Sequence, residues 1–213
     1  MDADSQRRQA AAGLESLASL VRAQSWRSDG TPSLPPSQAA VLRMLADADE
    51  GLRAGRIAER LGVSAASVSD SLAALESKRW IKRGADPRDL RATLVRLTAQ
   101  GKRTAQKLRD PLQGIGSLVG ALDERDLGAF LRVSQLLVAQ AQRQGLATGM
   151  RTCLGCRFFR PYSTGRDDKP HFCGFIEQPF GDAELRMDCA EQEPAEETIA
   201  AASAARFRRT LPP

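Results

Sequence analysis

The sequence is poor in several features that enzymes, membrane proteins and secreted proteins need. It has a single His among 213 residues, and we find neither a Ser-His-Asp set nor a glycine loop suited to phosphate, so we do not expect an enzyme. No apolar run approaches the roughly 20 residues of a membrane span, which excludes an integral membrane protein. The N-terminus, MDADSQRRQ, is charged where a signal peptide needs an apolar stretch. We therefore expect a cytoplasmic protein.

Aromatic residues are also scarce, and the cysteines are confined to one part of the chain. Aromatics make up 5% of the residues, so the core must be built mostly from Leu, Val and Ala, a composition that favours helices. The first 152 residues contain no Cys, and all four cysteines follow. In a chain without secretion signals, four such residues are better interpreted as metal ligands or reactive thiols than as disulfides.

Positive charge is concentrated in the middle of the chain. Residues 52–110 hold fourteen Lys and Arg against six Asp and Glu, a balance of +8. The whole chain carries +5, so the remaining residues sum to −3. A basic middle is the electrostatic signature of a protein that binds a polyanion, although a solvated charged face is an equally good explanation of composition alone.

Apolar periodicity predicts long helices on both sides of the basic segment. Residues 5–26 form an amphipathic pattern with four apolar residues on one face: Leu14, Leu17, Leu20 and Val21. A second helix is expected to be capped by Ser37. After the basic segment, a long helix begins at Ala99 behind a Thr98 cap and is kinked at Pro111, and a last helix, capped by Asp123, extends to about residue 144.

The basic segment itself predicts two short helices followed by a hairpin. The first helix covers about 55–61, Gly62 suits the left-handed position after a helix end, and Val63 is expected to pack inward. Ser64 would cap the second helix. Residues 84–92, rich in turn formers and charge, form the tip of a hairpin between two short strands. A helix-turn-helix followed by such a hairpin is a winged helix-turn-helix.

Residues 51–103 resemble the winged helix-turn-helix core of MarR-type transcriptional regulators. The most specific part is the wing sequence DPRDLR at 86–91, followed by VRLT at 95–98 and by Gly101. The resemblance covers roughly residues 5–145. It implies a two-fold dimer whose flanking helices form the interface, with the helix after Ser64 in the major groove and the wing along the DNA backbone.

The resemblance also implies which side chains face DNA. They are Ser64, Ala65, Ala66, Ser67, Ser69, Asp70 and Ser71 on the recognition helix, Lys78 after it, and Arg88 and Arg91 on the wing. Serine hydroxyls can meet phosphates or base edges, and alanine methyls can meet thymine methyls. For Asp89 we expect a salt bridge with Arg91 that holds the wing, and for Trp80 a place in the core.

The cysteines in the last third have the spacing C-x2-C-x16-C-x15-C. A C-x2-C pair can chelate one centre, and two further cysteines complete four thiolates, which need a cation. We expect the ligands to be Cys153, Cys156, Cys173 and Cys189. Nearby arginines (Arg151, Arg157, Arg160 and Arg166) would favour the thiolate form. His171 is expected outside the ligand set.

The identity of the cofactor is left open by the spacing. Zinc is slightly favoured, an iron–sulfur cluster suits scattered cysteines with aromatic cover, and redox-active or unligated thiols, including a disulfide switch, are the third alternative. The segment is too short to fold on apolar burial alone, so a metal would also serve as its core.

These observations predict a mainly α fold with a small β wing, in which a winged helix-turn-helix is flanked by long dimerisation helices and followed by a cysteine-rich appendage. The expected domains are residues 1–145, a metal-binding module at 146–195, and a tail at 196–213. This tail is expected to be flexible, with a short helix as the alternative. The expected function is a sequence-specific DNA-binding regulator, as a homodimer and a repressor, whose four-cysteine metal centre is structural or senses redox state, metal or nitric oxide. A small-molecule effector is a further candidate partner. The alternatives are a metal-stapled protein-interaction module and a cysteine-based redox protein.

Overall fold

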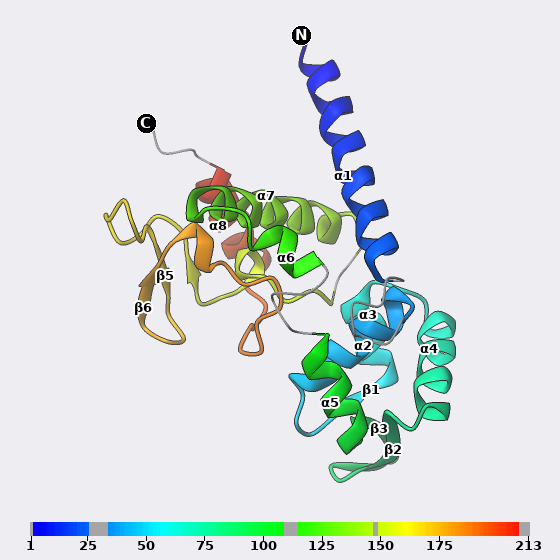
Figure 1. Ribbon diagram of the computed structural model, residues 1–213. Coiled ribbons are helices and arrows are strands. Elements are labelled where there is room, and N and C mark those ends of the chain that lie inside the picture. Colours follow the sequence, from blue (N-terminus) through cyan, green and yellow to red (C-terminus); the bar gives the residue numbers. More distant parts are fainter. Residues whose placement is uncertain (1, 26–33, 109–114, 147–148, 209–213) are drawn as a thin grey trace. The chain divides into compact units, whose positions relative to one another are not determined.

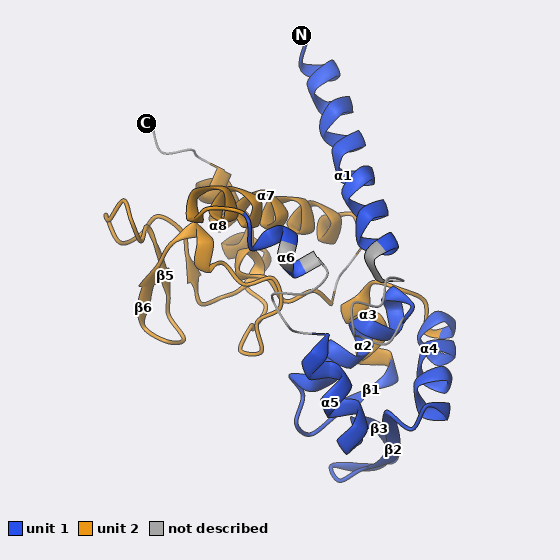
Figure 2. Ribbon diagram, in the orientation of Figure 1, with its two compact units in different colours: residues 1–54, 66–121 blue, residues 55–65, 122–213 orange. Residues whose placement is uncertain are grey.

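The computed structural model describes residues 2–25, 34–108, 115–146 and 149–208. These residues form a mainly helical structure with two small antiparallel sheets, as expected, divided into two compact units (Figures 1 and 2). Unit 1 contains residues 1–54 and 66–121, and unit 2 contains residues 55–65 and 122–213. The chain therefore does not divide at residue 145 as expected, because the helix before that point packs with the cysteine-bearing segment.

Unit 1 carries the wing and most of the recognition helix. Its elements are α1 (Ala3–Ser25), α2 (Pro36–Ala46), β1 (Leu52–Arg53), most of α4 (Ala65–Ser77), β2 (Ile81–Asp86), β3 (Asp89–Leu97), α5 (Ala99–Lys107) and α6 (Ile115–Val119). The sheet has the order β1-β3-β2, with Leu52 opposite Val95 and Ile81 opposite Leu97. Buried apolar side chains come from α2, α4 and the sheet: Val41, Leu42, Leu45, Val68, Leu72, Leu75, Ile81 and Val95.

The turn between α3 (Ala54–Leu61) and α4 forms as the sequence predicts. Gly62 has φ +65°, and the amide nitrogens of Gly62 and Val63 donate to the carbonyl oxygens of Glu59 and Ala58. These bonds close the end of α3 so that the chain can enter α4. The expectation for Val63 is wrong, however, because its side chain is 43% exposed.

Two of the four predicted helix caps are confirmed, and Ser64 lies directly before α4, which begins at Ala65. The Thr98 hydroxyl accepts a hydrogen bond from the amide of Gly101 at 3.1 Å, and the Asp123 carboxylate accepts one from the amide of Asp126 at 2.8 Å. Ser37 is not a cap, because α2 begins one residue earlier at Pro36. Proline is well suited to a first helical position, since it has no amide hydrogen to satisfy. The expected kink at Pro111 lies outside the described residues.

Unit 2 is built on α7 (Glu124–Arg143) and a second small sheet. Its other elements are α3 except Ala54, η1 (Cys153–Gly155), β4 (Phe159–Arg160), β5 (His171–Cys173), β6 (Gln178–Phe180), η2 (Asp182–Glu184) and α8 (Glu197–Arg208). The sheet order is β4-β5-β6, all antiparallel. One apolar cluster joins α7, the sheet and α8: Ala139, Leu154, Phe159, Phe180, Leu185, Ala204 and Phe207.

The segment after residue 196 is a helix, which was the alternative to the flexible tail that we expected. Residues 197–208 form α8, and Phe207 is fully buried among the aromatic side chains of the unit. The Arg132 guanidinium donates to the carbonyl oxygen of Phe207 and lies 4.6 Å from the centre of its ring. Burial of one large aromatic side chain thus anchors a segment whose composition alone suggests disorder.

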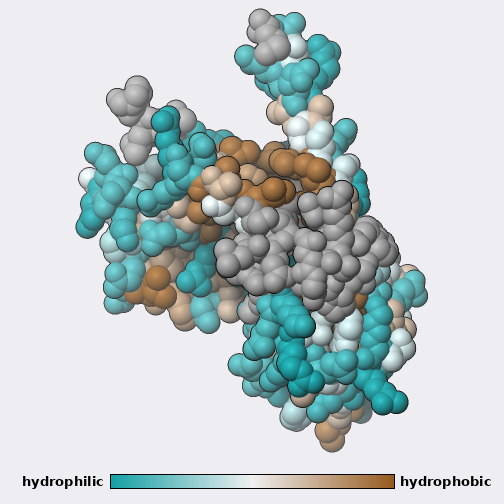
Figure 3. Space-filling model, in the orientation of Figure 1, coloured by the Kyte–Doolittle hydropathy of each residue, from teal (hydrophilic) through white to brown (hydrophobic). Residues whose placement is uncertain are grey.

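Apolar side chains remain exposed on α1 and α7. On α1 they are Leu14, Leu17, Leu20 and Val21, which share one face as predicted, and on α7 they are Phe130, Val133 and Leu137. Figure 3 shows apolar surface over α7. No helix of the described residues is both long enough and apolar enough to span a bilayer.

Candidate functional site

The exposed face of α4 carries most of the predicted recognition residues. Six of them are exposed: Ser64, Ala65, Ala66, Ser67, Ser69 and Asp70. Ser71 does not belong to this face, because it is 7% exposed and its hydroxyl donates to the Ser37 hydroxyl of α2 at 3.1 Å. Ser71 lies three residues after Val68 and next to Leu72, both buried, so it falls on the inward side of the helix.

The tip of the wing is fixed by a buried carboxylate that the sequence did not single out. Asp86, at the end of β2, accepts hydrogen bonds from the Arg88 amide at 3.0 Å and from two nitrogens of Arg53 at 2.6 and 2.9 Å. These donors, first the Arg88 amide and then Arg53, lower the pKa of Asp86 below its ordinary value. Arg53 lies in β1 beside β3, so it joins the base of the sheet to the turn of the wing.

Asp89 has a different partner from the one we expected. Its carboxylate pairs with Arg53 at 3.3 Å, and Arg91 contacts it only through a backbone amide at 3.2 Å. The predicted Asp89–Arg91 salt bridge is therefore wrong. The Arg91 side chain is exposed and does not hold the turn, so it can contact DNA.

The other basic residues predicted to face DNA, Arg88 and Lys78, have partners of their own within the protein. Arg88, 79% exposed at its side chain, pairs with Glu50 at 2.9 Å. An ion pair this exposed contributes little, so Arg88 could exchange Glu50 for a phosphate at small cost. The ammonium group of Lys78 donates to the Gln38 side chain at 2.9 Å and lies over the ring of Trp80, which is half-buried and not fully in the core as expected.

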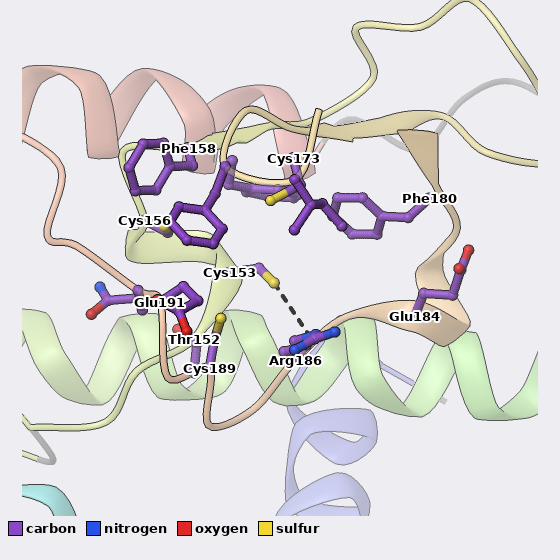
Figure 4. A pocket seen from close by; sticks show the side chains of 14 residues that line it. Thr152, Cys153, Cys156, Phe158, Cys173, Phe180, Glu184, Arg186, Cys189 and Glu191 are labelled. Carbon is purple, nitrogen blue, oxygen red and sulfur yellow. Dashed lines mark hydrogen bonds between the residues drawn. The ribbon is translucent and has the colours of Figure 1, made fainter. Parts of the chain in front are cut away.

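In unit 2, local hydrogen bonds bring the four cysteines together. The Cys156 amide donates to the Cys153 carbonyl at 2.9 Å across the C-x2-C turn, and the Cys189 amide donates to the Arg151 carbonyl at 2.9 Å. Cys173 lies in β5, the middle strand, opposite Phe159. All four thiols line one cavity of about 120 Å³, and Figure 4 shows the sulfur atoms of Cys153, Cys173 and Cys189 around its centre. None of the four is in a disulfide.

The rest of the cavity wall is largely apolar. It includes Phe158, Phe159, Phe175, Ile176 and Phe180. Thr152 also lines the cavity, and its hydroxyl is buried and has no hydrogen-bond partner among the described residues. Within residues 2–25, 34–108, 115–146 and 149–208, no three His, Cys, Asp or Glu side chains are arranged so that they could hold one metal ion together.

The expectation that arginines favour the Cys thiolates is wrong for Cys153. Three of the arginines are paired with carboxylates: Arg151 with Asp188, Arg157 with Glu193 and Arg166 with Asp168. Burial raises the pKa of the Cys153 thiol to about 11, and the hydrogen bond from the Arg186 amide to its sulfur at 3.3 Å offsets only part of that effect. Without a bound cation this thiol is neutral at physiological pH.

His171 lies outside the cysteine cavity. It is fully buried, its Nε2 is 2.8 Å from the Asp182 carboxylate, and its Nδ1 accepts the Tyr162 amide at 3.3 Å. Both ring nitrogens are thus used within the packing of unit 2, as expected for a residue that is not a ligand.

Unit 2 also contains a contact between the helix-turn-helix and the cysteine segment that no sequence pattern indicates. Arg60 of α3 is 5% exposed, and its guanidinium pairs with Asp188, the neighbour of Cys189. Beside this pair, the Gly149 amide donates to the Glu59 carbonyl at 3.2 Å. A Cβ at Gly149 would lie 2.3 Å from the Glu59 carbonyl carbon, so only glycine allows this approach. Arg60 and Asp188 are 128 residues apart in the chain.

The elements of the basic segment define a winged helix-turn-helix protein, with helix, glycine turn, helix and hairpin in that order. Residues 33–92, which contain this motif, match the family model described as MarR family. This segment of the chain, which is less than half of it, is thus similar to the MarR family.

Two solved structures, PcaV and CouR, give the same fold. The PcaV transcriptional regulator from Streptomyces coelicolor, in complex with its natural ligand, has a TM-score of 0.50 at 23% identity, over 66% of this chain and 96% of PcaV. CouR from Rhodococcus jostii RHA1, bound to p-coumaroyl-CoA, has a TM-score of 0.50 at 18% identity, over 61% of this chain and 87% of CouR. A MepR–DNA complex from S. aureus has a TM-score of 0.47 at 22% identity, over 55% and 86%. No curated protein matches the sequence.

Proposed function

We propose that this protein is a sequence-specific DNA-binding transcriptional regulator that acts as a dimer and represses its target genes. The observation that carries the proposal is the wing. Arg88 and Arg91 are exposed on a hairpin whose turn is held by other residues, Asp86, Asp89 and Arg53. A turn that is already fixed presents its arginines to a phosphate backbone without further ordering of its own backbone, although their side chains still lose rotamer freedom.

The side chains of the wing and of α4 suit different kinds of contact with DNA. Basic residues of the wing neutralise phosphates and set the orientation, and the exposed serines and alanines of α4 meet base edges and thymine methyls. The exposed face of α4 contains no Arg or Asn for bidentate contacts with a base. Specificity would therefore depend partly on DNA shape and on the wing.

The proposed dimer uses the exposed apolar faces of α1 and α7. Leucine, valine and phenylalanine side chains recur there at helical spacing and are about half exposed. A second copy of the chain would cover them, as dimerisation helices do in two-fold DNA-binding proteins. PcaV and CouR were solved with small ligands, so a small-molecule effector is included in the proposal.

The DNA-binding proposal is tested with a duplex selected by the wild-type protein from a random-sequence library. Replacing Arg88 or Arg91 with Ala should weaken binding and reduce the slope of log K against log salt by about one per lost phosphate contact. Arg166→Ala is the matched control, because Arg166 is also exposed and ion-paired but lies outside the wing. Failure to select any common sequence, or equal salt slopes in all four proteins, would contradict the proposal.

We further infer that the four cysteines hold one metal centre, zinc or an iron–sulfur cluster. What supports this is their convergence on one cavity from three separate parts of unit 2, the C-x2-C turn, β5 and the loop at Cys189. Single replacement of Cys153, Cys156, Cys173 or Cys189 by Ser should lower metal content by similar large factors and make residues 150–190 more sensitive to protease. Normal metal content in any one variant would remove that residue from the set.

The metal centre would either only stabilise unit 2 or also control DNA binding. The contact between Asp188 and Arg60 supports control, because a change at Cys189 would reach α3 through the adjacent residue. Removal of the metal should then change DNA affinity about 5- to 150-fold, the range of typical coupling. Equal affinity with and without metal would mean that the centre only stabilises unit 2. Absence of DNA binding by the metal-loaded protein would favour the alternative of an interaction module or a cysteine-based redox protein.

A further inference from the structure

We propose that a basic pocket of unit 1 binds the phosphate monoester group of a small ligand. The pocket has a volume of about 370 Å³ and is lined by residues of α2, the turn after it, β2, β3 and α5, all within unit 1 (Figure 2). Ligand pockets in proteins range from about 300 to 1,000 Å³. The inference rests on the proposed function only in treating this ligand as an effector of DNA binding, because the binding itself can be measured without DNA.

Three cationic side chains without partners line this pocket. They are Lys82 of β2, Arg96 of β3 and Lys102 of α5. No ion pair or side-chain hydrogen bond connects any of the three to another described residue. Other arginines of unit 1 do pair with carboxylates: Arg53, Arg83 and Arg88. The pocket therefore gathers the cations whose charge the protein itself leaves uncompensated.

Two of these cations are placed where they repel each other. Lys82 and Arg96 are directly opposite in the antiparallel pair of β2 and β3, so their side chains share one face of the sheet. Like charges in such positions destabilise a sheet. Asp49 also lines the pocket but forms no ion pair with them. Three cations and one carboxylate leave a net charge of +2 around the pocket, and a bound anion would replace repulsion with attraction.

The Arg96 side chain lies where two neighbouring residues have no side chain. A Cβ at Gly51 would lie 2.6 Å from the Arg96 Cγ, and a Cβ at Gly84 would lie 3.3 Å from its Nη1. Gly51 also has φ +86°, a conformation that favours glycine. Arg96 is half-buried in this position. A cation that is already confined loses less freedom when it binds an anion, so this arrangement favours binding.

The charge of the pocket favours a phosphate monoester over the phosphodiester of DNA. A monoester carries a charge of about −1.5 to −2 at pH 7 and three acceptor oxygens, which match the net charge and the three cations. A phosphodiester of DNA carries one negative charge. Lysine and arginine both bind phosphate groups through charge-assisted hydrogen bonds. The buried side chains of Leu45 and Leu97 also line the pocket and offer an apolar surface to the organic part of the ligand.

The test is calorimetric titration of the full chain with phenyl phosphate, a monoester, and with dimethyl phosphate, a diester. We expect saturable binding of phenyl phosphate and binding of the diester that is weaker by about ten-fold or more. Lys82→Gln and Lys102→Gln should each weaken phenyl phosphate binding about ten-fold. Lys107→Gln is the matched control, because Lys107 is exposed on the same helix as Lys102 but lies outside the pocket. Absence of saturable phenyl phosphate binding, equal binding of the two esters, or equal effects of all three substitutions would overturn the proposal.

A second measurement separates this site from a contact with DNA. Lys82→Gln and Lys102→Gln should keep the wild-type slope of log K against log salt for the selected duplex, because the DNA backbone does not fill the pocket. A slope reduced by about one in each variant would assign these cations to DNA and overturn the proposal.

The effector role is tested with the same duplex. Saturating phenyl phosphate should change the duplex affinity of the wild type, and an unchanged affinity would overturn the effector role. Binding of phenyl phosphate by a protein that binds no duplex would contradict the proposed function but support the phosphate site.

Discussion

Replacement of Asp188 by Asn is the sharpest test of how the cysteine segment is joined to the helix-turn-helix. The Arg60 side chain is 4% exposed and that of Asp188 44%, so the pair lies at the edge of the buried region. Burial lowers the pKa of Arg60 and Asp188 partly opposes this effect, so the carboxylate stabilises a cation that has lost most of its water. Breaking a fully buried pair costs about 3–5 kcal/mol and an exposed pair about 0–1 kcal/mol. We therefore expect a loss of about 2 kcal/mol, or roughly 4–8 °C in Tm.

The assay is thermal and urea unfolding of Asp188→Asn, Arg60→Met and the double variant. Methionine fills the buried space of Arg60 without a charge, so the double variant should be more stable than Asp188→Asn alone. Asp168→Asn is the control, because its pair with Arg166 is more than half exposed on both sides. It should cost about 0–1 kcal/mol. Equal effects of the Asp188 and Asp168 substitutions would refute the argument from burial.

Asp188→Asn also tests whether the metal centre controls DNA binding or only stabilises unit 2. If Asp188 carries the effect of the metal centre to α3, metal removal should change DNA affinity in the wild type but much less in Asp188→Asn. Both proteins should still bind metal, because Asp188 is not one of the proposed ligands. An unaltered response to metal in the variant would show that this contact is not the route of coupling.

Three further outcomes are expected. The pKa of Asp86 is lowered in the folded protein, so its bonds stabilise the wing above its ordinary pKa of 3.8 and that contribution is lost as the pH falls through the lowered value; Asp86→Asn should remove this part of the acid sensitivity in hydrogen-exchange measurements on the wing. Phe207→Ala should destabilise unit 2 by about 3–5 kcal/mol in urea unfolding, whereas a flexible tail would give no change. Leu17→Glu should shift the protein from dimer to monomer in sedimentation, and an unchanged dimer would exclude α1 from the interface.

The parts of the fold that the sequence predicted are those set by local rules. The turn at Gly62 needs a positive φ, and the caps at Thr98 and Asp123 need a side-chain oxygen next to free amides. Apolar spacing identified the buried face of α4, although it did not identify Ser71 as part of that face. A serine can point either way, and its partner on α2 is 34 residues distant. Long-range polar partners leave no periodic signal in a sequence.

The same distinction explains the errors in the wing and in the C-terminal segment. Asp89 has two arginines within reach, and Arg91, the near one in sequence, was the natural choice. The structure uses Arg53 because β1 lies beside β3 and brings that side chain to the turn. Residues 197–208 are rich in alanine and charge, and only Phe207 signals burial. One aromatic residue in such a segment is too weak a pattern to predict a packed helix.

The cysteine cavity combines both kinds of information. The C-x2-C turn is local, and the composition of the segment predicted that Cys173 and Cys189 would join it. All four line one cavity, whereas their role as metal ligands stays a prediction. The places of Cys173 and Cys189 in the cavity depend on how β5 and the loop before Cys189 pack within unit 2. Since Asp188 in that same loop binds Arg60, any cofactor that fixes Cys189 also fixes the partner of a buried charge on α3. The cysteine segment and the first helix of the helix-turn-helix are therefore joined by the Asp188 carboxylate as well as by the bond from the Gly149 amide to the Glu59 carbonyl.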